Sequence, residues 1–447
     1  MLEVTPHLDK NLKEPLYIQL FFHIKTEIRN GNIKTGEKLP SKRRLAQHLG
    51  ISQNTVDNAY QQLYAEGYIN SEPRRGMFVI YKEPNLFTYQ SLRKSIEYTE
   101  PKFTKGINNN LSIDFNPGNI DVSHFPYKKW RVYSNESMSQ EQSKLFSHGH
   151  PKGDILLREQ IASYLYQARG VRASIDQIII GTGNQYLIIM LLQLLSTHSN
   201  PSYGIEDPGF YRVRATLQKF NQSVTPSHQF PLGIIMPISR RLELLEWAYK
   251  SKDRFIIEDD YDGEFRYEGK PIPSLQGLDI QEKVIYLGTF SKSLIPSLRI
   301  SYMVLPPSLI EMYEKNALFL SQTISRFHQN TIYMFMKNGD WERHLNKMRV
   351  IYRNKRKLLL SSIEENFKKK VEVVGQNSGL HIILKINNCM IEQELIDSTL
   401  SKGVKVYPCS IHYCGKDKID SKLLLGFGGL NEYEIKHGIE LLARSWL

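Results

Sequence analysis

Cysteine is scarce in this 447-residue sequence, which contains only Cys389, Cys409 and Cys414. Three cysteines cannot build a disulfide framework, so we expect a reducing, cytosolic setting. Long apolar runs are missing as well: the longest, 186–195, is interrupted by Gln193 and is much shorter than the roughly 20 residues that span a bilayer. The first residues lack a basic segment followed by an apolar core, so we expect neither a signal peptide nor a membrane partner.

The overall composition is that of a globular protein. Hydrophobic residues make up 41% of the chain and charged residues 23%, which excludes collagen-like and wholly disordered classes. The length suggests about three domains, or a small domain joined to a large α/β one. The net charge of +12 indicates a polyanionic partner, although a lysine-rich solvated surface would give the same value.

The first 80 residues have the pattern of a winged helix-turn-helix. Pro15 precedes apolar residues spaced by four, Ser52 is placed to cap a later helix, and glycines 31, 50 and 67 follow the helical segments as stop signals. A basic SEPRRG segment separates two short β-type runs. The pattern predicts helices over 16–31, 41–49 and 53–66, and strands over 68–69 and 77–81.

In a helix-turn-helix the second helix of the pair enters the major groove, and its first residues meet base edges. The hairpin tip and the preceding helix are placed to contact phosphates. A small bundle unrelated to DNA is the alternative, and charge supports DNA only weakly because residues 1–82 carry +4 of the +12. The predicted DNA-binding residues are Ser52, Gln53, Asn54, Thr55, Lys42, Arg43, Arg44, Arg74 and Arg75.

Residues 15–80 resemble the GntR-type winged-helix domain of bacterial repressors. The resemblance rests on the G-x-(K/R)-LPS segment and on NTV-x-x-AY-x-x-L-x-x-EGY, which is a highly specific pattern. It implies a double-stranded DNA operator as partner.

Residues 83–111 lose this periodicity and are predicted to form a linker. Beyond them, strand and helix patterns alternate, which indicates a mostly parallel α/β sheet. The last stretch, 340–447, begins with a long basic helix (342–366) and is typical of a smaller α+β lobe. The predicted strands are 177–180, 255–258, 284–287 and 300–305, and the predicted helices are 154–169, 185–197, 239–250 and 307–336.

The segment 284–306 carries the groups that a phosphorylated aldehyde cofactor needs. A strand delivers Ser291 and Lys292 to a loop, where a lysine can form a Schiff base, and Arg299 follows for a phosphate. A second strand ends in Glu258-Asp259-Asp260-Tyr261, and pyridoxal phosphate needs a carboxylate at its ring nitrogen. A third runs through Gly181-Thr182-Gly183-Asn184 into a helix whose free N–H groups suit a phosphate.

Each of these segments is weak evidence alone, because SxK is common and an aspartate-rich strand end can also bind a metal. Cys409, His412 and Cys414 have the spacing of zinc ligands, but no fourth ligand is near, so we predict no metal site.

Together and in this order, the segments resemble the fold-type I aminotransferases found fused to GntR domains in the MocR-type transcription regulators. The resemblance covers nearly the whole chain and includes 113–130, 149–171, 206–210 and TPSHQFPLG at 225–233. It implies an α/β fold with a winged helix-turn-helix (1–82), a linker (83–111) and an aminotransferase-like domain (112–447) whose small lobe is about 340–447. It also implies a head-to-tail homodimer and a cytoplasmic, nucleoid-associated location.

The resemblance implies the cofactor pyridoxal 5'-phosphate and an amino-compound effector. Arg212 matches an arginine that holds an effector carboxylate in the GABA-responsive member. The implied roles are Lys292 as the Schiff-base lysine, Asp259 at the pyridine nitrogen, Tyr261 near the ring oxygen, Phe210 stacked on the ring, and Thr182, Gly183, Asn184, Ser291 and Arg299 around the phosphate.

Several positions depart from the aminotransferase pattern. Leu424 stands where the enzymes place an arginine for the substrate α-carboxylate, with His412 as a conceivable replacement. His148 stands at the tyrosine usually lent by the neighbouring subunit. Phe230 replaces an asparagine, so a ring-oxygen contact would fall to His228 or Gln229.

A shortening follows Phe210. Only 13 residues separate it from Val224, whereas relatives carry roughly two dozen more, enough for a crossover to another strand. We therefore expect one sheet strand to be missing, with one helix leading to a strand at 223–227.

These patterns favour a DNA-binding regulator that senses an amine or the B6 vitamer itself. Binding energy that differs between open and closed lobes would shift the DNA-binding arms. The alternatives are an active aminotransferase with an accessory DNA-binding domain, and a repressor whose second domain has lost the cofactor and serves dimerisation.

Overall fold

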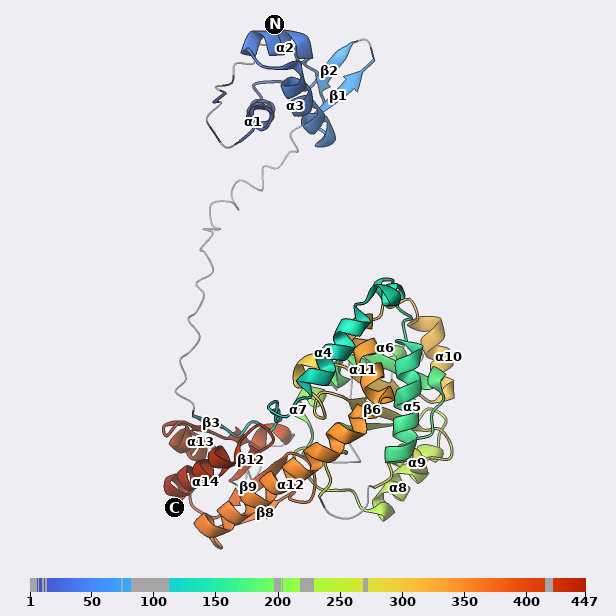
Figure 1. Cartoon of the computed structure of the whole chain (residues 1–447), viewed down its shortest axis with the longest axis vertical. Helices are drawn as coiled ribbons and strands as arrows, with labels where there is room; N and C mark the ends of the chain where they lie inside the picture. The colour runs from blue at the N-terminus through green and yellow to red at the C-terminus, as the bar shows by residue number, and fades with distance from the viewer. Residues whose placement is uncertain are drawn as a thin grey trace. The chain divides into compact units, whose positions relative to one another are not determined.

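The structure is a computed structural model of the chain (Figure 1). It describes residues 14–73, 75–81, 112–196, 204–217, 229–267, 272–414 and 421–447, together with 6, 8, 9, 12 and 202. The chain divides into two compact units, Met1–Ile107 and Asn108–Leu447, called here the N-terminal and C-terminal units. The helices of the described residues include none with the length and apolar character needed to cross a bilayer.

The N-terminal unit is a three-helix bundle with a two-stranded antiparallel hairpin, as the sequence predicts. Ser52 caps the third helix, and Gly50 ends the second in the left-handed conformation at φ 62°. Tyr60 is fully buried in the core with Leu20, and its hydroxyl donates to the Pro40 carbonyl at 2.9 Å. Its elements are α1 (Leu16–Arg29), α2 (Lys42–Leu49), α3 (Gln53–Ala65), β1 (Ile69–Glu72) and β2 (Gly76–Val79).

The large lobe of the C-terminal unit has a four-stranded sheet among the described residues, in the order β4-β7-β6-β5. These strands are β4 (Ile178–Gly181), β5 (Ile256–Asp260), β6 (Val284–Thr289) and β7 (Ser301–Val304). β5 and β6 are parallel, and β7 runs antiparallel to both of its neighbours, so one strand departs from the mostly parallel arrangement that the sequence predicts. The reason is the short connection from β6 to β7, which has no crossover helix to return the chain to the same end of the sheet.

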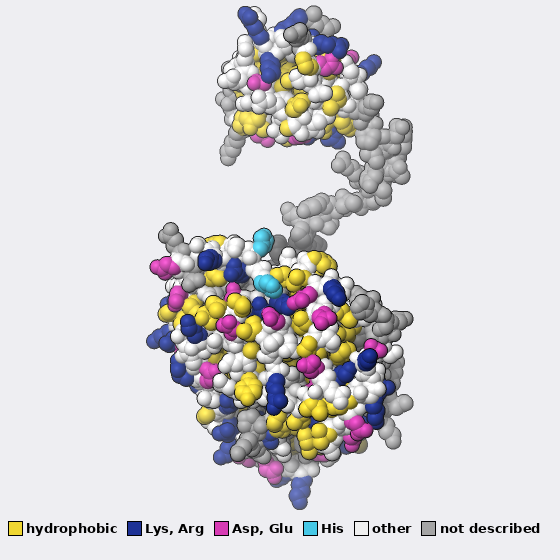
Figure 2. Space-filling model, turned by 90° about the vertical axis from the view of Figure 1, so that its right-hand side faces the viewer, with side chains coloured by type: hydrophobic (Ala, Val, Ile, Leu, Met, Phe, Trp, Pro, Cys, Tyr) yellow, Lys and Arg dark blue, Asp and Glu magenta, His cyan; other side chains and the backbone are white. Residues whose placement is uncertain are grey.

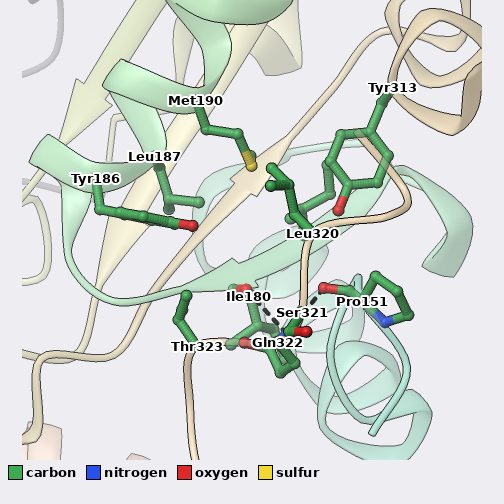
Figure 3. A pocket seen from close by; sticks show the side chains of 11 residues that line it. Pro151, Ile180, Tyr186, Leu187, Met190, Tyr313, Leu320, Ser321, Gln322 and Thr323 are labelled. Atoms are coloured by element: carbon green, nitrogen blue, oxygen red, sulfur yellow. Dashed lines mark hydrogen bonds between the residues drawn. The ribbon is translucent and has the colours of Figure 1, made fainter. Parts of the chain in front are cut away.

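Helices pack around this sheet, and one predicted helix is wrong. The span 307–336 is two helices, α10 and α11, because residues 317–325 leave the helical path. In that connection the Gln322 amide donates to the Pro151 carbonyl (3.0 Å) and the Ile180 carbonyl (3.2 Å), beside an apolar pocket (Figure 3). The helices are α4 (Tyr127–Ser137), α5 (Ile155–Arg169), α6 (Asn184–Ser196), α7 (Tyr211–Leu217), α8 (Ile238–Tyr249), α9 (Leu275–Leu278), α10 (Pro307–Asn316) and α11 (Arg326–Lys337), with 3-10 turns η2 (Gln140–Phe146), η3 (Ile175–Gln177) and η4 (Pro296–Leu298).

The small lobe contains more than the predicted 340–447. β3 (Ile113–Asp114) pairs in parallel with β10, and Phe115 is fully buried in the small-lobe core. The second sheet has the order β11-β12-β9-β8. The elements are α12 (Asp340–Phe367), β8 (Val371–Val374), β9 (His381–Ile386), α13 (Glu392–Leu400), β10 (Val404–Lys405), β11 (Tyr407–Pro408), η5 (Ser410–His412), β12 (Lys422–Gly426) and α14 (Glu432–Trp446).

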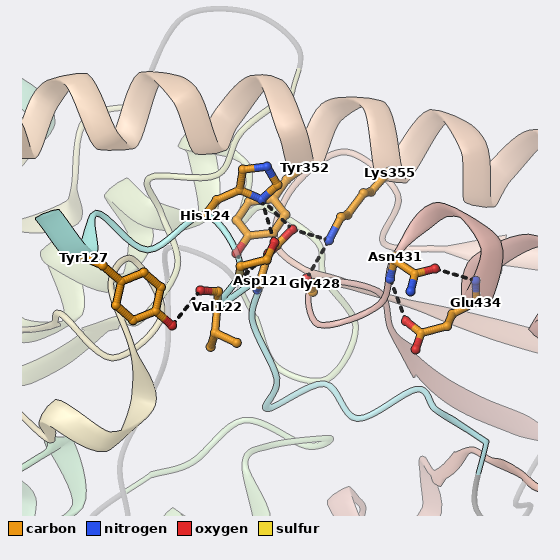
Figure 4. Close-up of polar contacts among 10 residues, drawn as sticks. Asp121, Val122, His124, Tyr127, Tyr352, Lys355, Gly428, Asn431 and Glu434 are labelled. Atoms are coloured by element: carbon orange, nitrogen blue, oxygen red, sulfur yellow. Dashed lines mark hydrogen bonds and ion pairs between the residues drawn. The ribbon is translucent and has the colours of Figure 1, made fainter.

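A buried ion pair ties the start of the C-terminal unit to α12 (Figure 4). The Lys355 ammonium lies 2.6 Å from Asp121 Oδ2 and also donates to the Gly428 carbonyl at 3.2 Å. Both side chains are less than 10% exposed. Burial by itself would raise the pKa of Asp121, but hydrogen bonds from Lys355 and Ser123 outweigh it and lower that pKa to about 2.

We predict that Lys355→Met lowers the free energy of unfolding by about 3–5 kcal/mol, because it leaves the Asp121 carboxylate buried without a counter-charge. Asp121 has a lower pKa folded than unfolded, so its contribution is present above pH 4 and is lost as the pH falls towards 2. Urea unfolding of wild type and variant, followed by tryptophan fluorescence between pH 3 and 7, measures both effects. The double variant with Asp121→Asn should recover most of the loss, and a single-variant effect below about 1 kcal/mol would contradict a buried-pair role.

Candidate functional site

The start of α3 is ordered by its own hydroxyl groups. Ser52 Oγ accepts the Thr55 N–H at 3.1 Å, and the two hydroxyl oxygens lie 2.8 Å apart. Gln53 and Asn54 are exposed, with their side chains outside this cap. Among the four predicted base-contacting residues, Gln53 and Asn54 are therefore best placed to reach a groove, and Ser52 and Thr55 fix where the helix begins.

The predicted phosphate-contacting cations differ in their surroundings. Arg43 and Arg44 are exposed on α2, whereas Lys42 forms an ion pair with Asp57 and so also ties α2 to α3. Arg75 pairs with Glu72, and its guanidinium carbon lies 5.3 Å from the Phe78 ring centroid. Arg74 lies outside the described residues.

In the C-terminal unit, a tight corner joins the start of α6 to the loop between β6 and β7. Gly183 has φ +84°, and a Cβ there would overlap the Arg299 guanidinium, so only glycine fits. Arg299 is itself in the left-handed region, at φ 52°. Thr182 directly precedes Gly183, and Ser291 lies in the loop between β6 and β7; both are partly buried. Ser291 Oγ is buried and has no hydrogen-bond partner among the described residues.

Asp259 lies at the carboxyl end of β5, where its side chain is almost fully buried (8% exposed). The Asn184 amide donates to its Oδ1 at 2.6 Å, a contact that the sequence did not reveal because the resemblance assigns Asn184 to the phosphate. Burial raises the pKa of Asp259 to about 7; the Asn184 hydrogen bond opposes this shift, and the charges of Asp260 and Asp262 add to it.

Lys292 follows the neighbouring parallel strand, so it emerges at the same edge of the sheet as Asp259. Its ammonium donates to the Pro117 carbonyl at 2.5 Å. Desolvation lowers the pKa of Lys292 to about 8, with a smaller opposing effect from the charge of Asp262. Gly426, at the end of β12, packs so closely against Pro117 that a Cβ at this position would overlap it. Pro117 therefore lies between the small-lobe strand β12 and Lys292.

A cluster of aromatic rings, called here the aromatic wall, is centred on Phe230. Its ring centroid lies 5.3 Å from Phe210, 6.1 Å from Tyr261, 4.9 Å from His412 and 5.1 Å from His381. The structure therefore brings Phe210 and Tyr261 to one cluster, as predicted for two groups around one ring. His381 is an addition that no local motif marked.

His412 does not replace the missing arginine. It is buried, its Nδ1 lies 3.2 Å from the Gly209 carbonyl oxygen, and burial lowers its pKa to about 4. The ring is therefore neutral at neutral pH and supplies no positive charge for a carboxylate. Leu424 is 1% exposed and packs with Ile383 and Cys409.

The other predicted site residues are exposed or already form hydrogen bonds within the fold. Gln229 donates to the Pro208 carbonyl and accepts the Leu232 N–H at 3.1 Å, so both ends of its amide are held within the fold. Arg212 is exposed on α7, where its Nε donates to the Tyr211 hydroxyl at 2.9 Å, and His148 is exposed after η2. His228 and the strand predicted at 223–227 lie outside the described residues.

A buried ion pair beside Asp259 escaped the sequence reasoning. Arg169 Nε donates to Asp260 Oδ2 at 2.7 Å, and the Tyr286 hydroxyl donates to the same oxygen at 2.6 Å. These contacts hold the end of β5 against α5 and β6. The run of carboxylates at 258–260 was the available signal, but its partner Arg169 is 91 residues away from Asp260 in the sequence.

Comparisons with known proteins identify the family and the fold of the chain. Residues 16–79 match the model of the bacterial regulatory proteins, gntR family. The chain is 43% identical to the uncharacterized HTH-type transcriptional regulator YdeL of Bacillus subtilis, with all of both chains covered in an alignment of 470 positions. The probable rhizopine catabolism regulatory protein MocR of Rhizobium meliloti is 27% identical, with 98% of this chain and 95% of MocR covered.

The solved structure of Pyrococcus horikoshii kynurenine aminotransferase, a complex with PMP, superposes with a TM-score of 0.66 at 24% identity, covering 82% of this chain and 94% of that one. This likeness shows the fold-type I aminotransferase fold of the C-terminal unit. From the full-length identity to YdeL, the gntR match and this fold, the chain belongs to the MocR-type family of helix-turn-helix transcriptional regulators with an aminotransferase-like domain.

Proposed function

We propose that this DNA-binding regulator holds pyridoxal 5'-phosphate in its aminotransferase-like domain and senses an amino compound there. The observation that carries the proposal is the pairing of a buried carboxylate with a desolvated lysine at one sheet edge. Asp259 lies at the end of β5, and Lys292 follows the parallel strand β6. Neither side chain forms an ion pair with any of the described residues.

The residues present fit the cofactor. The Ser291 hydroxyl and Asn184 Oδ1 are buried polar atoms without hydrogen-bond partners among the described residues, and such atoms are costly unless a ligand completes them. The start of α6, with Gly183 tight against Arg299, offers N–H groups and a guanidinium to a phosphate. Thr182 and Ser291 would add hydroxyl donors to this phosphate site.

Each residue has a defined task in this proposal. Asp259 would hold a proton at the pyridine nitrogen, and a cation there would offset the burial that raises the pKa of this carboxylate. Because the pKa of Lys292 is about 8, a large fraction of its amine is neutral near pH 8 and could attack a carbonyl carbon. Tyr261 would lie at the ring oxygen and Phe210 at the ring face. Bound pyridoxal phosphate supplies an aldehyde that bonds to amines and a ring that withdraws electrons.

The surroundings of the site favour sensing over transamination. Leu424 is buried in an apolar cluster and His412 is neutral, so neither position gives a cation for an α-carboxylate. We propose Arg212 on α7 as the contact for an effector that carries a more distant carboxylate. An active aminotransferase remains the second candidate, because the Lys292 and Asp259 arrangement would also serve catalysis.

We also propose that the chain forms a head-to-tail homodimer, which would match paired operator half-sites. Large apolar side chains on the C-terminal unit support this: several are more than half exposed, and Figure 2 shows apolar patches on one face. Those on α4, η2, α5 and the segment before α11 are Val132, Met138, Phe146, Ile155 and Phe319.

The first prediction concerns the lysine. We expect pyridoxal phosphate followed by borohydride to label the peptide containing Lys292, and Lys292→Ala to abolish this label while the exposed-site control Lys347→Ala keeps it. The attachment rate should rise about tenfold per pH unit below pH 8 and level off above it, because only the neutral amine attacks. Peptide mass spectrometry and stopped-flow absorbance give the two measurements, and unchanged labelling of Lys292→Ala would refute the assignment.

The second prediction concerns the effector class. Absorbance titration of the loaded protein should give a 2-phenylethylamine affinity at least equal to that of L-phenylalanine. Leu424→Arg should strengthen L-phenylalanine binding by about 10- to 100-fold, since a charge-assisted hydrogen bond contributes about 1.5–3 kcal/mol. Leu424→Gln, which adds no charge, is the control, and a tenfold preference of the wild type for the amino acid would contradict the prediction.

The third prediction concerns the DNA end. Gln53→Ala and Asn54→Ala should each weaken binding to the chain's own upstream DNA by about 1–3 kcal/mol, with little effect on unrelated DNA. Fluorescence anisotropy with both duplexes measures the ratio. Gln62→Ala, about two turns further along α3 than Asn54 and hydrogen-bonded to Glu66 at 3.1 Å, should behave as wild type. Equal losses on both duplexes would mean that these residues do not read bases.

A further inference from the structure

Part of one helix of the C-terminal unit carries many cations and no acidic residue. Residues 343–357 contain seven lysines and arginines and no aspartate or glutamate, while the whole chain carries +12. All fifteen lie on α12, the long helix that runs between the two lobes in Figure 1. This charge density is unrelated to the winged helix, which lies in the other unit.

Three of the seven cations are used inside the fold. Lys355 is buried on Asp121, Arg349 Nε donates to the Glu264 carbonyl at 2.9 Å, and Arg356 Nε donates to the Gln376 carbonyl. In Figure 4 Lys355 points from α12 into the protein. These three therefore have structural partners that explain their presence.

The other four cations share the outer surface of α12. Arg343, Lys347, Arg353 and Lys357 are all exposed. At about 100° per residue they fall within a sector of roughly 120°, on the side of the helix opposite to the buried Tyr352 and Lys355. Within the described residues, the side chains of Lys347, Arg353 and Lys357 form no hydrogen bond or ion pair that would require a cation there.

A second helix extends this surface. Lys128, Lys129 and Arg131 are exposed on α4. α4 lies against the start of α12, because Lys129 Nζ is 3.7 Å from Asp340 Oδ2 and the Tyr133 hydroxyl donates to the same oxygen at 2.6 Å. The seven residues Lys128, Lys129, Arg131, Arg343, Lys347, Arg353 and Lys357 are called here the basic face.

We infer that the basic face binds the phosphate backbone of DNA, as a second DNA-contacting surface in addition to that of the winged helix. From Arg343 to Lys357 the helix rises about 21 Å, a length of duplex that carries about 12 phosphates. Arg343 and Lys129 share Asp340, but Lys347, Arg353 and Lys357 form no ion pair among the described residues and suit contacts that are independent of base sequence. A membrane surface fits less well, because Val350 is the one large exposed apolar side chain that α12 offers among the described residues.

The basic face would add DNA affinity because the same chain tethers it to the winged helix. Once the winged helix has bound its site, adjacent DNA is present at a high effective concentration for any basic surface on the same chain. Each phosphate contact then adds affinity through counterion release without altering sequence preference. The basic face therefore strengthens binding to longer DNA and leaves operator choice to α3.

The test is the salt dependence of DNA binding by the full-length protein. The variant Lys347→Gln/Arg353→Gln/Lys357→Gln is compared with Arg172→Gln/Lys315→Gln/Lys436→Gln, which removes three exposed cations elsewhere on the C-terminal unit. Anisotropy is measured with duplexes of the chain's own upstream region and of unrelated sequence, each of about 60 base pairs, between about 50 and 200 mM salt.

We expect the first variant to lower the slope of log K against log salt by about 2 to 3, at roughly 0.9 per lost phosphate contact, and the control to leave it unchanged. The preference for upstream over unrelated DNA should stay the same in both, whereas the Gln53 and Asn54 variants change that preference. Equal slopes for the two triple variants would overturn the proposal. So would an unchanged slope together with loss of co-sedimentation with phosphatidylserine vesicles, which would assign the face to a membrane surface.

Discussion

The desolvation of Asp259 and Lys292 is the constraint on which the C-terminal unit depends. A buried carboxylate and a buried ammonium each lose water, and here burial brings the pKa of Asp259 up to about 7 and that of Lys292 down to about 8. If these two positions served only the stability of the fold, apolar residues there would avoid this loss of hydration. The surrounding contacts offset the cost: Asn184 donates to the carboxylate, the Pro117 carbonyl accepts from the ammonium, and the Arg169–Asp260 pair holds the strand end in place.

The sequence predicted the elements whose signals are local. Apolar spacing located α1, α3, α5 and α12 within a few residues, because a helix buries one face at a period of 3.6. The sequence did not indicate the direction of β7 and merged α10 with α11, because strand pairing and the contacts of Gln322 are set by residues distant in the sequence. Such contacts leave no periodic pattern in the segment itself.

The candidate site shows the same division. Lys292, Asp259 and Gly183 were found by residue type and order, and the structure adds how close they are to Asn184, Pro117 and Arg299. The charge state of His412 could not be inferred from the sequence, since a histidine is cationic or neutral according to burial, and here it is buried. Burial thus turns a conceivable carboxylate ligand into part of an aromatic wall with Phe230.

α12 connects the two kinds of chemistry in this regulator. Its first turns, with Trp341 and Leu345, pack in the large-lobe core, and its later turns, with Leu359 and Phe367, pack in the small-lobe core. A change in the angle between the lobes would therefore displace or bend this helix, whose middle is held to Asp121 by Lys355. Because the same helix carries Arg343 to Lys357 on its outer side, a ligand that favours one lobe arrangement would also change how these cations are presented. The ligand and the polyanion would then be coupled through packing alone, without a contact between them.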